Sequence, residues 1–231
     1  MKHIRQWLGS KVSPWLGDAN VQYLVRILGL LPLIIVFGFA LQTLLGMATT
    51  LSFVAGAGLL ADVAMIAFTA MLAMTPISIL TGWQWPQRLR RPLALYAFAY
   101  SMIHFLIFSG GFGFAPVAVA TGAFANAMLA TGTIALFGMV PLALTSNLWS
   151  MKRLGKNWKR LHYLTYPIAI LIIAHLYFLG GALPWAILYA VLLGVRIPPI
   201  RRAIVNWRKQ RRQLTQRLKP QTTKTKSAFA D

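Results

Sequence analysis

Two histidines, His104 and His175, lie deep inside apolar stretches of a chain that has four histidines in all. An ionisable side chain inside a membrane segment is costly to bury, so it marks a functional site by default. His104 follows Pro92, where its apolar segment begins, by 12 residues, and His175 follows His162 by 13. At 1.5 Å per helical residue, both imidazoles lie about 18 to 20 Å from the basic ends of their helices. We therefore expect the two side chains at one depth, where they can share a ligand.

Paired imidazoles at one depth are typical of haem iron held by two axial histidines. The alternative is that each histidine hydrogen-bonds a carbonyl or hydroxyl group of a neighbouring helix. Two histidines at equal depth, with no acidic partner nearby to form a proton relay, favour the haem. Zinc suits the sequence less well, because a closed structural zinc site needs four ligands and the chain has no cysteine.

A third histidine, His162, lies at the basic mouth of the same segment as His175, beside Lys159 and Arg160. It is separated from His175 by about 20 Å of helix, a distance that allows it to bind a second haem closer to the basic end. These residues therefore form a second candidate cofactor site.

The partner of that second site is not a histidine. Counting back 13 or 14 residues from His104 leads to Arg91 and Arg90, so a second bis-histidine site is incomplete. The two arginines can instead pair with haem propionates or with a flavin phosphate. The fourth histidine, His3, lies in the polar head, where we expect it to be solvated.

Composition places the chain in a membrane. Of its 231 residues 58% are hydrophobic, and the mean hydropathy is +0.63. Apolar runs of about 20 residues, the length that crosses a bilayer, recur along it. The net charge of +20 comes from 23 Lys and Arg against three acids. In a soluble protein this charge would indicate nucleic acid, but Lys and Arg are enriched in the cytoplasmic flanks of membrane helices, so we expect no nucleic-acid partner.

We predict an all-α bundle of six transmembrane helices with both termini in the cytoplasm. The connections 46–57, 111–122 and 181–182 contain no Lys or Arg, whereas the alternate connections and both ends hold all of them. This alternation fits an even number of spans with the basic side in the cytoplasm. The expected helices are at about 24–45, 58–82, 92–110, 123–147, 162–180 and 183–200.

The sequence divides into three parts around that bundle. Residues 1–23 form an amphipathic cytoplasmic head, residues 24–200 form the membrane domain, and residues 201–231 form a basic tail, helical at first and partly disordered. Basic clusters of this kind bind anionic lipid headgroups. The turn Gly180-Gly181-Ala182 predicts a helical hairpin between the last two spans.

Three segments resemble one protein family. They are PLALTSNLWSMKRLGKNWKRLHYLTYPIAILIIAHLYFL at residues 141–179, RRPLALYAFAYSMIHFLIF at residues 90–108, and the LAMTP that closes the second span. The chain resembles the MsrQ (YedZ) family of haem-binding membrane subunits, which serve the periplasmic protein-methionine-sulfoxide reductase system. That family belongs to the wider ferric-reductase-like transmembrane group.

The resemblance implies one or two b-type haems, with His104, His175 and His162 as ligands. It also implies FMN or a quinol as donor on the cytoplasmic side, with a soluble flavin reductase as one source of electrons. The implied acceptor is a periplasmic molybdopterin enzyme, MsrP, which repairs oxidised methionine, a reversible lesion. The implied location is the bacterial inner membrane.

We therefore expect an electron-transfer subunit of an oxidoreductase, with the substrate chemistry in its partner. One alternative is a stand-alone transmembrane ferric or quinone reductase that uses the same haems. Another is a transporter with structural histidines, which would carry coupled acidic residues inside its spans. Only Asp62 meets that condition, and it lies near the outer edge.

Overall fold

The structure is a computed structural model that describes residues 18–46 and 50–217, and within these residues all regular secondary structure is helical. The predicted head up to residue 17 and the end of the tail from residue 218 lie outside the described residues. The helices are α2 (Asp18–Leu44), α3 (Thr50–Thr81), α4 (Trp85–Gly110), α5 (Pro116–Ala123), α6 (Ala127–Leu144), α7 (Leu148–Leu154), α8 (Lys156–His162), α9 (Thr165–Phe178), α10 (Ala182–Gly194) and α11 (Pro198–Arg217).

Four stretches of the described helices are long and apolar enough to cross a membrane: Ala55–Thr81, Trp85–Gly110, Ala127–Leu144 and Lys156–Phe178. The pair α10 and α11 passes the same test together but is bent by 69°, which makes a fifth span if the pair counts as one. The multi-pass helical membrane fold predicted from the sequence is therefore confirmed. The count of six spans and the cytoplasmic termini stay predictions.

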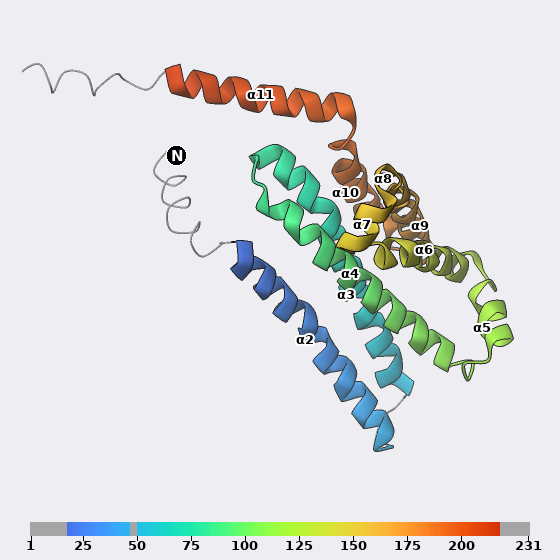
Figure 1. Cartoon of the computed structure of the whole chain (residues 1–231). Helices are drawn as coiled ribbons and strands as arrows, with labels where there is room; N and C mark the ends of the chain where they lie inside the picture. The colour runs from blue at the N-terminus through green and yellow to red at the C-terminus, as the bar shows by residue number, and fades with distance from the viewer. Residues whose placement is uncertain (1–17, 47–49, 218–231) are drawn as a thin grey trace, which may run out of the picture.

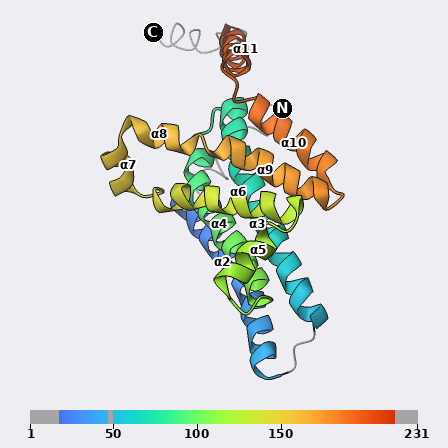
Figure 2. The ribbon, with the colours of Figure 1, turned by 90° about the vertical axis from the view of Figure 1, so that its right-hand side faces the viewer.

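The helices form two groups that meet at the middle of the molecule. Helices α2, α3 and α4 run side by side, while α6 lies along α9, and α10 contacts both α9 and α3 (Figures 1 and 2). The buried core lies where the groups meet, and its most deeply enclosed members include Leu72, Ala169 and Tyr189. The Tyr189 hydroxyl forms a 3.0 Å hydrogen bond with Thr69 Oγ1, which satisfies a polar group inside this apolar core.

Helix α4 begins earlier than predicted. The sequence places Arg90 and Arg91 in a loop that ends near Pro92, but α4 starts at Trp85 and includes both arginines. Pro86 lies in the first turn, where a missing N–H removes no helical hydrogen bond. Because prolines are tolerated at that position, the basic residues continue the helix instead of interrupting it.

The predicted loop at 148–161 is also largely helical. Asn147 caps α7 by accepting a 2.7 Å hydrogen bond from the Ser150 N–H, and the chain turns between α7 and α8 at Gly155. Gly155 has φ +51°, a backbone conformation that glycine adopts without steric cost. These two short helices bring His162 back to the bundle.

The predicted span 123–147 is shorter at both ends in the structure, because α6 runs from Ala127 to Leu144 and a separate helix, α5, ends at Ala123. Asn126 starts the second helix by accepting a 2.9 Å hydrogen bond from the Leu129 N–H. An asparagine cap of this kind satisfies one of the N–H groups that a helix start leaves free.

The hairpin between the last two spans is confirmed. Helix α9 ends at Phe178, Gly180 has φ +82°, and α10 begins at Ala182. Helix α10 is shorter than predicted and stops at Gly194, just before the pair Pro198-Pro199, which starts α11. Proline disfavours helical backbone in the residue before it, so the chain bends here. Helix α11 then runs across one end of the molecule (Figure 1).

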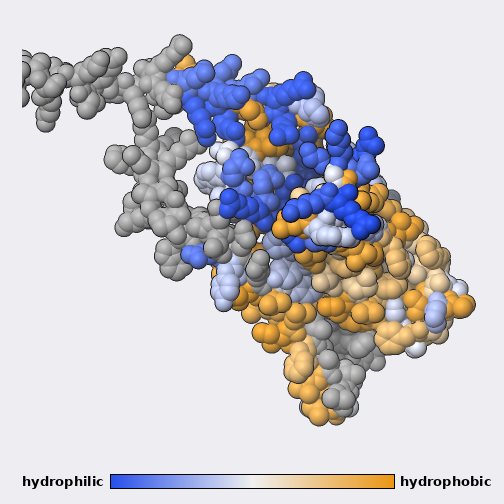
Figure 3. Space-filling view, viewed as in Figure 1, coloured by the Kyte–Doolittle hydropathy of each residue, from blue (hydrophilic) through white to orange (hydrophobic). Residues whose placement is uncertain are grey.

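Hydropathy separates the two ends of the molecule. Hydrophilic side chains gather over α11 and the neighbouring helix ends, whereas the surface away from them is mainly apolar (Figure 3). Large apolar side chains are exposed there, such as Ile34 at 66% and Phe37 at 69%. A soluble protein rarely exposes so much contiguous apolar surface, so these residues suit contact with lipid. We call the hydrophilic end the basic end.

Candidate functional site

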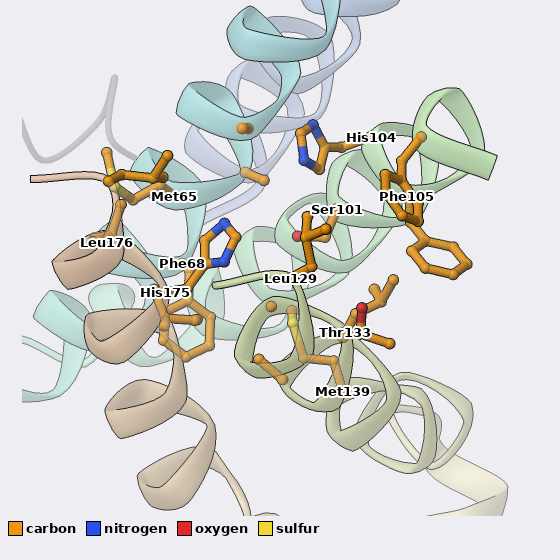
Figure 4. A pocket seen from close by; sticks show the side chains of 18 of the residues that line it. Met65, Phe68, Ser101, His104, Phe105, Leu129, Thr133, Met139, His175 and Leu176 are labelled. Atoms are coloured by element: carbon orange, nitrogen blue, oxygen red, sulfur yellow. The ribbon is translucent and has the colours of Figure 1, made fainter. Parts of the chain in front are cut away.

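A cavity of about 200 Å³ lies between α3, α4, α6 and α9. His104 from α4 and His175 from α9 both line it, and Figure 4 shows their imidazoles projecting into the same space. Helix α4 packs along α3, and α9 packs along α6, so the cavity separates the two histidine-bearing helices. The remaining lining is mostly apolar and includes Ala64, Met65, Phe68, Phe105, Phe108, Gly132, Leu136 and Met139.

Hydrogen bonds to the backbone fix the state of both rings. His104 Nδ1 lies 2.9 Å from the Ala57 carbonyl oxygen, and His175 Nδ1 lies 2.7 Å from that of Met128. A carbonyl oxygen accepts but cannot donate, so each Nδ1 carries the proton and donates it. A neutral imidazole with its proton on Nδ1 carries its lone pair on Nε2. Donation of this kind is how proteins orient a histidine that binds a metal through its other nitrogen.

Helix α6 approaches the His175 ring closely at Gly132. A Cβ atom at this position would lie 2.7 Å from His175 Nδ1 and 2.8 Å from Cε1. Any side chain here would displace the imidazole or break its hydrogen bond to Met128. The absent side chain at Gly132 is therefore part of what holds His175 in place.

Aromatic rings form the part of the lining beside His104. Phe105 and Phe108 lie next to each other with centroids 5.9 Å apart, and Phe137 meets Phe105 edge-on at 5.9 Å. An apolar cavity with two opposed imidazoles and few other polar groups suits a flat, largely apolar ligand that contains a metal. Among the described residues no three His, Asp or Glu gather in a way that would hold a bare metal ion.

His162 occupies a different place from the other two histidines, outside the lining of this cavity. Its ring stacks on Trp158 with centroids 3.9 Å apart, and its Nδ1 donates to the Trp158 carbonyl oxygen at 3.0 Å. Trp158 in turn donates from Nε1 to the Thr145 carbonyl oxygen at 3.0 Å. The Nε2 atom of His162 is buried and has no hydrogen-bond partner.

Of the four predicted basic residues, the structure brings one to His162. Arg90 is half-buried and interacts electrostatically with His162, and its Nε atom is buried without a partner. Arg91, Lys159 and Arg160 are exposed. The half-buried Arg90 therefore belongs to the second candidate site, while the other three lie at the surface of the basic end.

Arg196 is a further residue at the basic end, and its place in the sequence alone does not reveal its role. Arg196 Nη2 donates to the Leu72 carbonyl oxygen at 2.6 Å. In a regular helix that carbonyl would accept from the residue four positions later, but this residue is Pro76, which has no N–H. The proline inside α3 was the available signal, because it leaves one carbonyl in need of a donor.

The family model described as "Ferric reductase like transmembrane component" matches residues 57–173, about half of the chain, so the chain belongs to this family. The matched region contains His104 and His162, and His175 follows shortly after its end. No solved structure matches the chain.

Several curated relatives carry the name "Protein-methionine-sulfoxide reductase heme-binding subunit MsrQ". The chain is 37% identical to the one from Azospira oryzae over 130 residues, which cover 53% of this chain and 56% of that protein. It is 37% identical to the Rhizobium meliloti protein over 140 residues, 58% of this chain and 64% of the relative. It is 36% identical to the Rhodospirillum rubrum protein over 135 residues, which cover 55% of this chain and 65% of that protein. The resemblance to MsrQ is thus confirmed, over less than two thirds of each relative's length.

Proposed function

We propose that this protein is a haem b electron-transfer subunit of the membrane. It would pass electrons from a flavin or quinol donor in the cytoplasm to a periplasmic molybdopterin methionine-sulfoxide reductase of the MsrP kind. The observation that carries the proposal is the pair of imidazoles at one cavity, each with Nδ1 tied to a backbone carbonyl and Nε2 left as the free nitrogen. The printed names of the relatives, which call them heme-binding subunits, support the same function.

The residues at the cavity fit a haem. His104 and His175 would hold the iron, and the apolar lining suits the faces of a flat macrocycle. When bound, haem iron supplies one-electron redox chemistry. With both hydrogen-bonded imidazoles as its ligands, the iron would suit electron transfer better than oxygen binding. The protein's own part is to orient both rings and to exclude water from between them.

His162 and Arg90 form the proposed entry site for electrons at the basic end. The free Nε2 of His162 suits a second haem, and Arg90 suits the propionate of that haem or the phosphate of FMN. Arg91, Lys159 and Arg160 are exposed beside them and provide positive charge for docking a cytoplasmic donor.

We also propose six spans, both termini in the cytoplasm, and the bacterial inner membrane as location. Helix α2, with 27 residues, is long enough to cross a bilayer and would add the sixth span to the five candidates. The start of α2 and the whole of α11 lie toward the basic end (Figure 1). Under the positive-inside rule that end faces the cytoplasm. In this orientation the basic helix α11 lies against anionic lipid headgroups.

The proposal is tested by the optical spectrum of the purified protein. We expect a reduced b-type haem spectrum, and we expect His104→Ala and His175→Ala each to remove the component that arises from the shared haem. A matched control is His3→Ala, which changes a histidine in the polar head and should leave the spectrum intact. If both cavity variants keep the full spectrum, the pairing of these histidines is wrong.

A second candidate function is a stand-alone ferric or quinone reductase with the same haems, which the description of the matched family favours. The two functions separate in one assay. Reduced protein in vesicles is mixed either with an MsrP-like enzyme and methionine sulfoxide or with a ferric chelate alone. Rapid haem reoxidation by the chelate, with none by the enzyme, would favour the second function.

A further inference from the structure

Two arginines at the basic end are half-buried close together without a counter-ion. Arg90 comes from α4, and Arg196 comes from the bend between α10 and α11, yet their positive charges interact with each other. The hydroxyl group of Tyr166 accepts a hydrogen bond from Arg196 and interacts electrostatically with Arg90. No carboxylate among the described residues interacts with either arginine. Repulsion between partly desolvated like charges is unfavourable unless a negative group lies between them.

The acidic residues of the chain are not placed to supply that negative group. Its three acids are Asp18, Asp62 and Asp231. Asp62 lines the histidine cavity, Asp18 begins α2, and Asp231 lies outside the described residues. Buried arginine pairs without an acidic residue are typical of sites that bind the phosphate or carboxylate of a ligand.

Buried side-chain groups without a hydrogen-bond partner occur on both arginines and one turn along α3 from the Leu72 contact. In the part of the chain that the structure describes, four buried side-chain atoms have no hydrogen-bond partner, and three of them are the Nε atoms of Arg90 and Arg196 and the hydroxyl oxygen of Thr75. Thr75 lies one turn along α3 from Leu72, whose carbonyl oxygen binds Arg196. Buried donors are almost always satisfied in folded proteins, because leaving one unpaired is costly.

We propose that Arg90, Arg196 and Thr75 form a binding site for an oxyanion, a carboxylate or phosphate group that belongs to a molecule bound at the basic end. Arg196 is held by the Leu72 carbonyl through Nη2, which leaves its Nε–H available to the oxyanion, and Arg90 presents its own Nε–H from α4. The site deepens the proposed function and rests on it for the source of the oxyanion. The source is a haem propionate, the phosphate of FMN or the headgroup of an anionic lipid.

The test uses the full-length protein in detergent and three pairs of probes that differ in the oxyanion. They are FMN against riboflavin, haem against haem dimethyl ester, and phosphatidylglycerol against diacylglycerol. We expect the unaltered protein to prefer the anionic member of at least one pair. Arg90→Gln and Arg196→Gln should each reduce that preference about tenfold or more, the usual weight of a charge-assisted hydrogen bond. The probe pair whose preference falls in these variants identifies the molecule that supplies the oxyanion.

Two exposed lysines provide matched controls, because Lys152→Gln on α7 and Lys156→Gln on α8 each remove one positive charge from a position outside the proposed site. Both should keep the preference. Thr75→Val removes one donor without a change of charge or of the Leu72 contact, so it tests the site even if an arginine variant fails to fold. The proposal is overturned if no pair is discriminated, or if Thr75→Val and the folded arginine variants discriminate as the unaltered protein does. The haem spectrum, recorded on the same samples, shows separately whether the proposed function holds.

Discussion

At the scale of single residues, the geometry of the cavity depends on which ring nitrogen of each histidine is engaged. Both Nδ1 atoms donate to carbonyl oxygens that lie on other elements, Ala57 on α3 and Met128 on α6. The tautomer and the ring plane are therefore fixed by the packing of helices, before any ligand binds. A site prepared in this way needs little reorganisation when an electron arrives or leaves.

Gly132 is the residue whose substitution would most directly disturb the fixed orientation of the His175 ring. We expect Gly132→Ala to force the His175 ring away from the Met128 carbonyl oxygen, because the new Cβ would lie 2.7 Å from Nδ1. The b-type haem content of the purified protein should fall several-fold or more, while its helix content by circular dichroism stays the same. Gly58→Ala is the control, because nothing lies within 4 Å of a Cβ at that position. Equal haem content in both variants would contradict the role assigned to Gly132.

At the scale of elements, α11 is tied to the end of α3 through Arg208. Its Nη1 donates to the Ile79 carbonyl oxygen at 2.7 Å, and its guanidinium lies against Gly82. The last carbonyls of a helix have no partners within it and attract positive charge. Arg208 thus acts as a distant cap, which holds α11 across the basic end after the 69° bend.

We expect Arg208→Gln to loosen α11 from α3. The expected loss of stability is about 1–2 kcal/mol, the weight of a hydrogen bond from a charged donor together with its effect at a helix end. Limited proteolysis in detergent should cut sooner near Ile197, between α10 and α11, than in the unaltered protein. Lys209→Gln removes an adjacent exposed charge and should not change the rate. The same rate in both variants would show that Arg208 does not hold α11.

At the scale of the whole molecule, the asymmetry of charge indicates how the protein lies in the membrane. The basic end holds α11 and the helix ends nearby (Figure 3), whereas the connections 46–57, 111–122 and 181–182 contain no Lys or Arg. If the basic end faces the cytoplasm, His162 lies on the donor side, and the His104–His175 cavity lies farther toward the periplasm.

The absence of cysteine from the sequence makes that orientation simple to measure. A single cysteine at Val117→Cys, in α5, should react with a membrane-impermeant maleimide added to cells with a permeable outer membrane and an intact inner membrane. Lys209→Cys, in α11, should react only after the inner membrane is opened. Val117 is 80% exposed, and Lys209 is exposed as well, so access through the protein does not limit either reaction. The reverse pattern would place the basic end in the periplasm.

The sequence predicts the parts of the molecule that follow from local rules. Apolar length gives the membrane helices, the two glycines give the α9–α10 hairpin, and equal depth brings His104 and His175 to one cavity. The two short helices before His162 were missed, because their caps consist of single residues inside a basic segment. Arg196 was missed because its partner on α3 is 124 residues away, a contact that only the packing of α10 on α3 creates.

That contact has a consequence for how the protein changes over time. Pro76 takes one N–H away from α3, and Arg196 returns a donor to the same Leu72 oxygen from another helix. If another residue replaced Pro76, its N–H could bond the Leu72 carbonyl oxygen, and Arg196 would no longer be needed for this purpose. Loss of Arg196 alone would leave that oxygen without a hydrogen-bond donor. The two sites should therefore covary among descendants of a common ancestor, although nothing in their sequence spacing links them.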